Sequence, residues 1–212
     1  MYPCPLCNTK RSSLYFSDAA CTYYRCSECE LIFLDSRHHL TPTAEKAHYD
    51  THNNDPGDAR YRDFLRRLFD PMSQRVSLPA RGMDFGCGPG PALALMFAEA
   101  GYEMTTYDKY FACDSNALEN KYDFITCTEV VEHLAQPGEV LGALLEQILS
   151  RGWLGVMTRF ITPETDFASW YYRRDPTHIA FYSHTSLRWL AGRHQCDIEF
   201  AGDDIALLRK IS

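Results

Sequence analysis

The sequence has 212 residues, of which 45% are hydrophobic, and a formal net charge of −7 at pH 7. This length suits one ordinary domain with a small addition, and the hydrophobic share is sufficient for a packed core. The acidic balance argues against a nucleic-acid partner, which usually meets a basic face, and no apolar run is long enough to span a membrane.

The first 35 residues carry two Cys-x-x-Cys pairs, Cys4-Pro-Leu-Cys7 and Cys26-Ser-Glu-Cys29. Each pair presents two thiolates on one tight turn, and four thiolates form a closed tetrahedral site for Zn²⁺. The sequence therefore predicts a structural zinc ribbon over residues 1–35, with zinc bound by Cys4, Cys7, Cys26 and Cys29. Short strands are expected between the pairs, around Tyr15 and Tyr24, and cysteines that are buried without a metal are the alternative.

The chain has nine cysteines, an odd number, and begins without a basic leader or an apolar stretch. We therefore expect a cytoplasmic protein, in which cysteines serve as metal ligands or apolar residues rather than as disulfides. Cys21 fits neither pair and is interpreted as a spectator or as a local alternative ligand.

Residues 36–57 are polar and rich in turn formers, which predicts a linker between the ribbon and a larger domain at 58–212. Within that domain, Phe64, Leu65, Leu68 and Phe69 recur at helical spacing and predict an amphipathic helix over 58–76. Tyr49 and Tyr61 are candidates for a lid over a ligand.

Residues 82–90, Gly-Met-Asp-Phe-Gly-Cys-Gly-Pro-Gly, predict a strand that ends in a glycine turn before a helix. The glycines accept backbone angles that are closed to other residues and let a ligand approach the main chain. The amides at the helix start then face a polar or negative group.

This G-x-G-x-G spacing, with Asp84 two residues before the first glycine, resembles the first motif of the class I S-adenosylmethionine-dependent methyltransferases. A glycine turn in another α/β enzyme is the alternative. The next expected strand, 102–107, ends in Asp108, where an acid is placed to accept both ribose hydroxyls of a nucleoside. The resemblance implies a set of cofactor-binding residues that comprises Asp84, Phe85, Gly86, Cys87, Gly88, Gly90, Asp108, Lys109, Thr128 and Glu129.

The segment between Asp108 and the strand at 123–127 is too short for the helix and strand that usually follow. We therefore expect the third strand of the family's sheet to be missing or vestigial, with Lys109, Tyr110 and Phe111 flanking the adenine instead. The expected fold class is α/β, a Rossmann-like, mostly parallel sheet with an antiparallel hairpin at 196–211. A helix is expected over 138–150, a strand over 153–158 and a helix over 184–194.

Residues 128–134, Thr-Glu-Val-Val-Glu-His-Leu, resemble the E-V-x-E-H-L segment of class I enzymes, particularly the O-methyltransferases of ubiquinone biosynthesis. In some relatives such a trio and a distant histidine hold a divalent cation that polarises the acceptor hydroxyl. The corresponding set here is Glu129, Glu132, His133 and His178. In the alternative, Glu132 and His133 only fix the loop by hydrogen bonds.

The aromatic stretch 160–182 is expected to form either an acceptor pocket or part of the core. The resemblance implies methyl transfer from S-adenosylmethionine to a small-molecule acceptor, by O-methylation, with Glu132 and either His133 or His178 at the reaction centre and a histidine as base. One alternative is a non-catalytic scaffold whose ribbon binds a protein partner. Another is an RNA methyltransferase whose ribbon docks on RNA.

Overall fold

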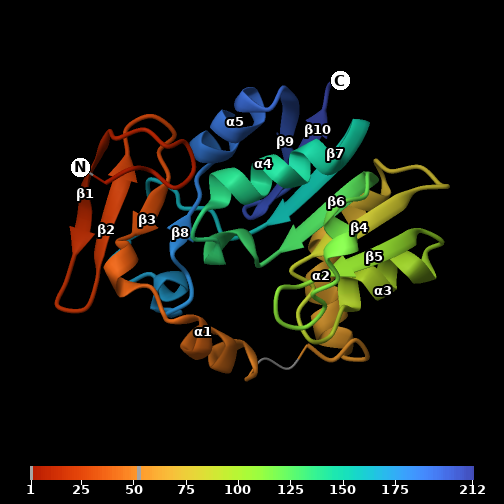
Figure 1. Ribbon diagram of the computed structural model, residues 1–212, viewed down its shortest axis with the longest axis horizontal. Coiled ribbons are helices and arrows are strands. Elements are labelled where there is room, and N and C mark those ends of the chain that lie inside the picture. Colours follow the sequence, from red (N-terminus) through yellow and green to blue (C-terminus); the bar gives the residue numbers. More distant parts are fainter. Residues whose placement is uncertain (1, 52–53) are drawn as a thin grey trace.

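The computed structural model describes residues 2–51 and 54–212, and its centre is a six-stranded sheet (Figure 1). The strand order is β5-β4-β6-β7-β10-β9. Neighbouring strands β5, β4, β6 and β7 are parallel, whereas β10 runs antiparallel to both β7 and β9. The strands span β4 Arg81–Phe85, β5 Glu103–Tyr107, β6 Tyr122–Thr128, β7 Ile148–Met157, β9 Cys196–Phe200 and β10 Ile205–Lys210. The predicted fold class is confirmed.

The missing third strand is also confirmed. Strand β5 lies at the edge of the sheet, and no strand of the described chain pairs with its outer side. Between β5 and β6 the chain forms only a bridge from Asp108 to Ala112 and a short 3-10 helix, η2 (Ser115–Leu118). The cleft beside β5 is therefore bounded by a loop instead of a strand.

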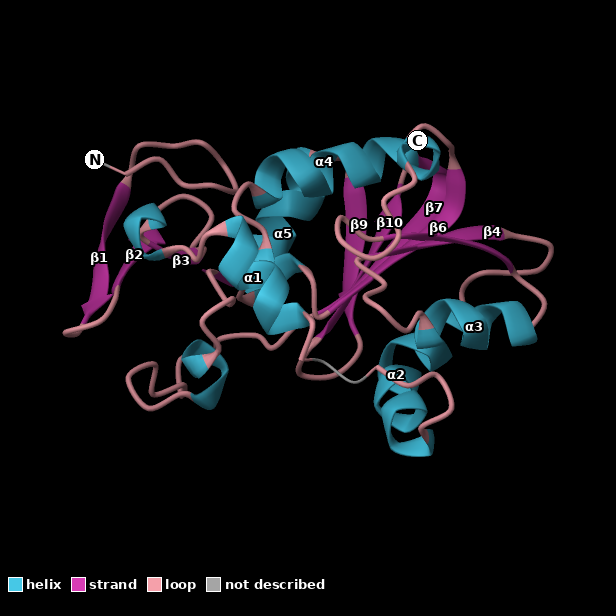
Figure 2. Ribbon diagram, turned by 60° about the horizontal axis from the view of Figure 1, so that its bottom comes forward, coloured by secondary structure: helices cyan, strands magenta, loops and turns pink. Residues whose placement is uncertain are grey.

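Helices cover both faces of this sheet, as Figure 2 shows. Along β10, Ile205 and Leu207 pack with one pair of helices, whereas Ala206 and Leu208 pack with the other, as alternation in a strand requires. Helices α2 (Ala59–Ser73) and α3 (Ala92–Glu99) cover the first face, and α4 (Pro137–Gln147) and α5 (His184–Arg193) cover the second.

A second, four-stranded sheet joins the N-terminal segment to the aromatic stretch. Strands β1 (Ser12–Ser17), β2 (Thr22–Cys26) and β3 (Ile32–Leu34) form an antiparallel meander. The sequence predicts short strands around Tyr15 and Tyr24 but not how they pair. Strand β3 also pairs with β8 (Ala180–Phe181), which comes from the aromatic stretch (Figure 1). This pairing was not predicted, because two residues give no strand pattern.

The segment interpreted as a linker contains the 3-10 helix η1 (Ser36–His38) and helix α1 (Pro42–Tyr49). Thr41 caps α1 and Pro42 occupies its first turn, which favours helix initiation. The helix escaped prediction because none of its residues is fully buried, so it has no apolar stripe. No described helix is both long and apolar enough to cross a membrane.

The aromatic stretch packs mainly as core. Phe167, Tyr172 and Phe181 form one cluster with Tyr23 and Ile32 of the N-terminal strands. The aromatic stretch also contains the 3-10 helix η4 (Tyr171–Arg174). A further 3-10 helix, η3 (Val131–His133), follows β6. Of the two expectations for the aromatic stretch, core packing describes Phe160, Phe167, Tyr172, Phe181 and Tyr182, whereas Tyr171 is exposed.

Candidate active site

The backbone conformation of the turn between β4 and α3 itself favours glycine at two positions. Gly86 has a φ of +75° and Gly88 of +65°, in the region that favours glycine. A Cβ on Gly86 would lie 2.4 Å from Cγ2 of Val130. The N–H of Gly86 donates to the carbonyl of Tyr107 at 2.7 Å, which ties the turn to the end of β5.

A cavity of about 410 Å³ opens beside this turn, at the carboxyl ends of β4, β5 and β6. It is lined by nine of the ten predicted cofactor-binding residues, namely Asp84, Phe85, Gly86, Cys87, Gly88, Asp108, Lys109, Thr128 and Glu129. Gly90 is the exception. Its Cα faces the carbonyl of Asn54, which would lie 1.8 Å from a Cβ, so the preceding segment packs directly on the turn.

The carboxylate of Asp108 is held in place at this cavity by three backbone donors. Its Oδ2 accepts from the N–H of Gly88 at 3.1 Å, and its Oδ1 accepts from Tyr110 and Phe111 at 2.8 and 3.1 Å. The acid after β5 therefore bridges the glycine turn and the loop that replaces the third strand. Lys109, Tyr110 and Phe111 line the same cavity.

Two further polar groups face the cleft from the centre of the sheet. Asp84 is buried and accepts a hydrogen bond from the Thr126 hydroxyl at 2.8 Å, and burial raises the pKa of Asp84 to about 7. The Thr128 hydroxyl oxygen is buried and has no hydrogen-bond partner among the described residues. A buried polar atom without a partner is costly, so this side of the cavity suits a polar ligand.

His133 and His178 line the other end of the cavity, whereas Glu132 is fully buried and does not line it. The ligand atoms of these three residues all lie within 4.8 Å of one another. The sequence-based set is thus brought together except for Glu129, which lines the cavity but lies outside this group. The physical reason is that Glu129 adopts a positive φ of 52°, which directs the chain away from the helical turn on which the prediction depended.

The Tyr172 hydroxyl occupies the space between the two glutamates. It donates to Glu132 and lies 3.3 Å from Oε2 of Glu129. Burial raises the pKa of Glu132 to about 7 and that of Glu129 to about 8, the latter also because the two carboxylates repel each other. The other oxygen of Glu132, Oε2, is buried and accepts no hydrogen bond within the described chain.

Each of the two histidine rings places its Nδ1 beside a backbone carbonyl. Nδ1 of His133 lies 3.0 Å from the Thr177 carbonyl, and Nδ1 of His178 lies 2.7 Å from the Tyr172 carbonyl. A carbonyl only accepts, so each Nδ1 carries the hydrogen and each neutral ring has its lone pair on Nε2. Burial, together with the neighbouring His133, lowers the pKa of His178 to about 4, which keeps that ring neutral near pH 7.

Helix α1 borders the cavity through its last residue, Tyr49, and the helix was missed as part of the site. Glu45 accepts hydrogen bonds from Lys109 at 2.8 Å and from the Tyr110 hydroxyl at 2.6 Å. Four residues later, the Tyr49 ring meets His133 edge to face, with centroids 5.4 Å apart. Only the tyrosine was anticipated, because a glutamate in a polar segment gives no signal of its long-range partner.

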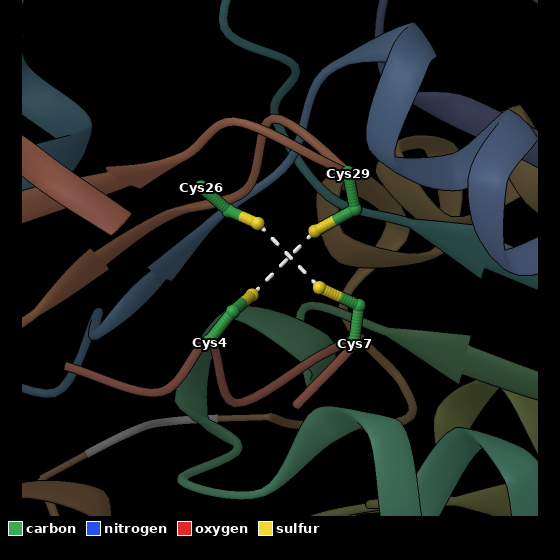
Figure 3. A group of neighbouring side chains, drawn as sticks. All are labelled: Cys4, Cys7, Cys26 and Cys29. Carbon is green, nitrogen blue, oxygen red and sulfur yellow. Dashed lines mark hydrogen bonds between the residues drawn. The ribbon is translucent and has the colours of Figure 1, made fainter. Parts of the chain in front are cut away.

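The four predicted zinc ligands converge on one point (Figure 3). The sulfur atoms of Cys4 and Cys29 are 3.5 Å apart and those of Cys7 and Cys26 are 3.4 Å apart, well beyond a disulfide bond of about 2.05 Å. All four lie within 4.8 Å of one another. Tetrahedral zinc with Zn–S bonds of about 2.3 Å places sulfurs roughly 3.8 Å apart, which this geometry matches.

The two cysteine turns have the same backbone. Asn8 and Glu30, which follow the second cysteine of each pair, both have a positive φ and donate to the carbonyl of the first cysteine. The pKa of Cys4 falls to about 6, first because of its hydrogen bond with Cys29 and then because the N–H groups of Cys7 and Leu6 point at its sulfur. Two equivalent turns that present sulfur atoms to backbone N–H groups suit a metal centre.

Comparison with known proteins agrees with this architecture. The sequence model of the family described as "Methyltransferase domain" matches residues 51–199. No curated protein matches the chain.

Among solved structures, the chain is similar to 1,6-didemethyltoxoflavin-N1-methyltransferase of Burkholderia thailandensis, with 14% identity, a TM-score of 0.55, and coverage of 94% of this chain and 100% of that one. Magnesium protoporphyrin IX methyltransferase of Synechocystis PCC 6803 gives 14% identity and a TM-score of 0.55, with 80% of this chain and 94% of that one covered. At these identities the structures establish a common fold. Because the family model covers more than half of the sequence, the chain belongs to the methyltransferase domain family.

Proposed function

We propose that this protein transfers a methyl group from S-adenosylmethionine to a small-molecule acceptor. The observation that carries the proposal is the single cavity that joins the glycine turn and the fixed Asp108 carboxylate to the histidine pair. The first group suits a nucleoside and the second suits an acceptor. Both solved structures named above have S-adenosylhomocysteine bound, according to their descriptions, and both enzymes act on small molecules.

The residues present fit this cofactor. Asp108 would accept the ribose hydroxyls, Tyr110 and Phe111 would flank the adenine, and the backbone of Gly86 and Gly88 would lie against the rest of the nucleoside. The Thr128 hydroxyl, which has no partner within the described residues, would meet the polar methionine end. When bound, the sulfonium supplies an already activated methyl group, so the protein mainly has to align the acceptor and exclude water.

We further propose O-methylation, with a histidine as the proton acceptor. Both rings present Nε2 lone pairs, and the Nδ1–H of each ring is fixed by a carbonyl, which is how an orienting hydrogen bond prepares a general base. Because His133 and His178 both line the cavity, either can face an acceptor hydroxyl. Glu132 would stabilise the protonated ring that results.

As the alternative to a histidine base, the same side chains are a donor set for a divalent cation, because the Nε2 lone pair of one ring binds either the cation or the acceptor's proton. Histidines that ligate metals usually donate their other N–H to a carbonyl or carboxylate, as both rings do here, and Glu132 has a buried oxygen that accepts nothing within the described chain. A bound cation would supply Lewis-acid polarisation of the acceptor oxygen. Titration with Mn²⁺, followed by the electron spin resonance signal of the free ion, tests this site in wild type and in Glu132→Gln.

For the N-terminal centre we propose structural Zn²⁺ bound by Cys4, Cys7, Cys26 and Cys29. A closed set of four sulfurs leaves no position for a substrate, so the metal would serve folding. The expected result is one equivalent of zinc in purified protein, measured by inductively coupled plasma mass spectrometry.

The experiment that tests methyl transfer is calorimetric titration with S-adenosylhomocysteine, followed by transfer of radiolabel from S-adenosylmethionine to a fractionated small-molecule extract. Binding is expected in wild type and should weaken about 10- to 100-fold in Asp108→Ala, because a charged hydrogen-bond partner is lost. Asp197→Ala, at an exposed position on β9, is the control. No binding to the wild type would overturn the proposal.

A further inference from the structure

The N-terminal segment with its two cysteine turns, residues 2–35, is here called the cysteine module. It contacts the catalytic part of the chain where the acceptor residues lie. The N–H of Leu34, at the end of β3, donates to the carbonyl of Ile179 at 2.9 Å, and the N–H of Ile179 donates to the carbonyl of Glu132, also at 2.9 Å. One residue, next to His178 in the sequence, therefore links the module to the Glu132 backbone.

A second contact lies at the start of α4, just after the loop that carries Glu132 and His133. The N–H of Gly138, in the first turn of α4, donates to the Pro5 carbonyl at 3.1 Å. A Cβ at position 138 would lie 2.3 Å from the carbonyl oxygen of Leu6, so the first cysteine turn packs directly on this helix. The loop that carries Glu132 and His133 is thus held by the module on both sides.

A third contact fixes the segment that carries Tyr172 and His178. Arg173 forms an ion pair with Asp18 at 2.9 Å, and its guanidinium lies over the Phe16 ring, 4.7 Å from the centroid. A second cavity, of about 340 Å³, lies between the module and residues 173–178. It shares Asp175 and His178 with the first cavity, so these two residues separate the module from the active site.

The cofactor-binding loops lie elsewhere. Figure 1 shows β4 and β5, whose ends carry the glycine turn and Asp108, in the part of the six-stranded sheet that lies farther from β1, β2 and β3. A displacement of the module should therefore disturb one end of the cavity and spare the other.

From these contacts we infer that the cysteine module is a positioning element of the acceptor half of the active site, and not an independent docking domain. It fixes the main chain at Ile179 and Gly138 and thereby sets where Glu132, His133 and His178 stand. The inference rests on the proposed function, because that function assigns these three residues to the acceptor. No residue of the module is among those that line the first cavity, so the module would act through the loops that it holds.

The test compares Gly138→Ala with Gly192→Ala. Both glycines are helical, but a Cβ at 192 meets nothing within 4 Å, so the second variant is a matched control. The readouts are the amide exchange rate of Ile179, the imidazole Nδ1–H proton resonances of His133 and His178 by NMR, and calorimetric binding of S-adenosylhomocysteine. These readouts need no acceptor.

In Gly138→Ala we expect Ile179 to exchange at least about tenfold faster and both imidazole resonances to shift or broaden, while the affinity for S-adenosylhomocysteine stays within about twofold of wild type. Gly192→Ala should match wild type in all three. Unchanged Ile179 exchange and unchanged imidazole signals in Gly138→Ala would overturn the inference. A loss of cofactor binding that accompanies the faster exchange and the shifted signals would overturn it as well. A wild type that binds no S-adenosylhomocysteine would instead overturn the proposed function and leave the coupling measurement valid.

If Gly138→Ala does not fold, Asp18→Asn takes its place, because it removes the module's partner for Arg173 at a partly exposed position. Glu28→Gln is its control, since Glu28 pairs only within the module, with Arg11. Asp18→Asn, but not Glu28→Gln, should shift the His178 resonance in the same way while the cofactor affinity stays constant. An unshifted resonance would count against the inference.

Discussion

The two halves of the active-site cavity are built in different ways. The cofactor half uses a nearly continuous stretch, from Asp84 to Phe111, folded as strand, turn, helix and strand. The acceptor half gathers residues from distant segments, including Tyr49, His133 and His178, and is held by strand β3 from the start of the chain. One half therefore depends on local geometry, whereas the other depends on long-range packing.

The halves also differ in electrostatics. In the cofactor half the Asp108 carboxylate accepts hydrogen bonds from three backbone N–H groups. In the acceptor half, burial raises the pKa of Glu129 and Glu132 and lowers that of His178, which favours neutral forms. The difference suits a half that binds polar nucleoside groups and a half that moves a proton.

The largest expected effect comes from removing one of the four proposed zinc ligands. Cys29→Ser should cost several kcal/mol of folding free energy and abolish zinc binding, because Cys29 is fully buried and belongs to the main core as well as the metal centre. Zinc content and thermal unfolding measure this. Cys21→Ser, outside the cluster, should keep both, and equal melting of the two variants would contradict the account.

Gly86→Ala should break the cofactor half and spare the acceptor half. Its φ of +75° costs an alanine about 1–2 kcal/mol, and the new Cβ would meet Val130. We expect the affinity for S-adenosylhomocysteine to fall by about two orders of magnitude, or near 3 kcal/mol, with zinc content unchanged. Calorimetry checks this, with Gly192→Ala as control. Wild-type affinity in Gly86→Ala would show that the turn does not carry the cofactor.

Titration should affect mainly the acceptor half. The pKa of His178 is lowered from 6.5 to about 4, so the stability that the neutral ring contributes is lost as pH falls below 6.5 toward 4. The pKa of Glu132 is raised from 4.5 to about 7, so the stability of its protonated form, present below pH 4.5, is lost as pH rises through 7.

These two groups give a measurable prediction of roughly 1–2 kcal/mol each. Melting temperatures from pH 4 to 8 should show that His178→Gln flattens the decline on the acid side and Glu132→Gln flattens the decline on the alkaline side. Glu119→Gln, at an exposed position, should change neither slope. Identical pH profiles for the wild type and both site variants would contradict the assigned environments.

The smallest effect is expected where the two halves meet, at Glu45 on α1. Glu45→Gln weakens the ion pair with Lys109 and the hydrogen bond from Tyr110, which are partly exposed, so the change should stay below about 1 kcal/mol. Cofactor affinity should fall a few-fold at most. Glu164→Gln, at an exposed position away from the cavity, should have no effect. A loss of affinity in Glu45→Gln equal to that of Gly86→Ala would make α1 a principal binding element.

What could be predicted from the sequence follows the same division. The glycine turn, Asp108 and the cysteine pairs were predicted because each depends on spacing within a short stretch. The absent third strand followed from chain length between Asp108 and residue 123.

Features made by distant segments could not be predicted. No local pattern pairs Ile32 with Phe181, places the Tyr172 hydroxyl on Glu132, or brings Glu45 to Lys109. Glu129 was placed in the metal set on the assumption of a regular helical turn, which its positive φ breaks. In each case the tertiary packing, and not the local propensity, decides the position.

The most direct test of the whole account is a crystal structure with S-adenosylhomocysteine and bound metal located by anomalous scattering. The account predicts the ribose hydroxyls at the Asp108 carboxylate, the sulfur directed toward His133 and His178, and zinc among the four cysteine sulfurs. A ligand bound outside the cleft of Gly86 and Asp108, or with its sulfur turned away from the histidine pair, would contradict it.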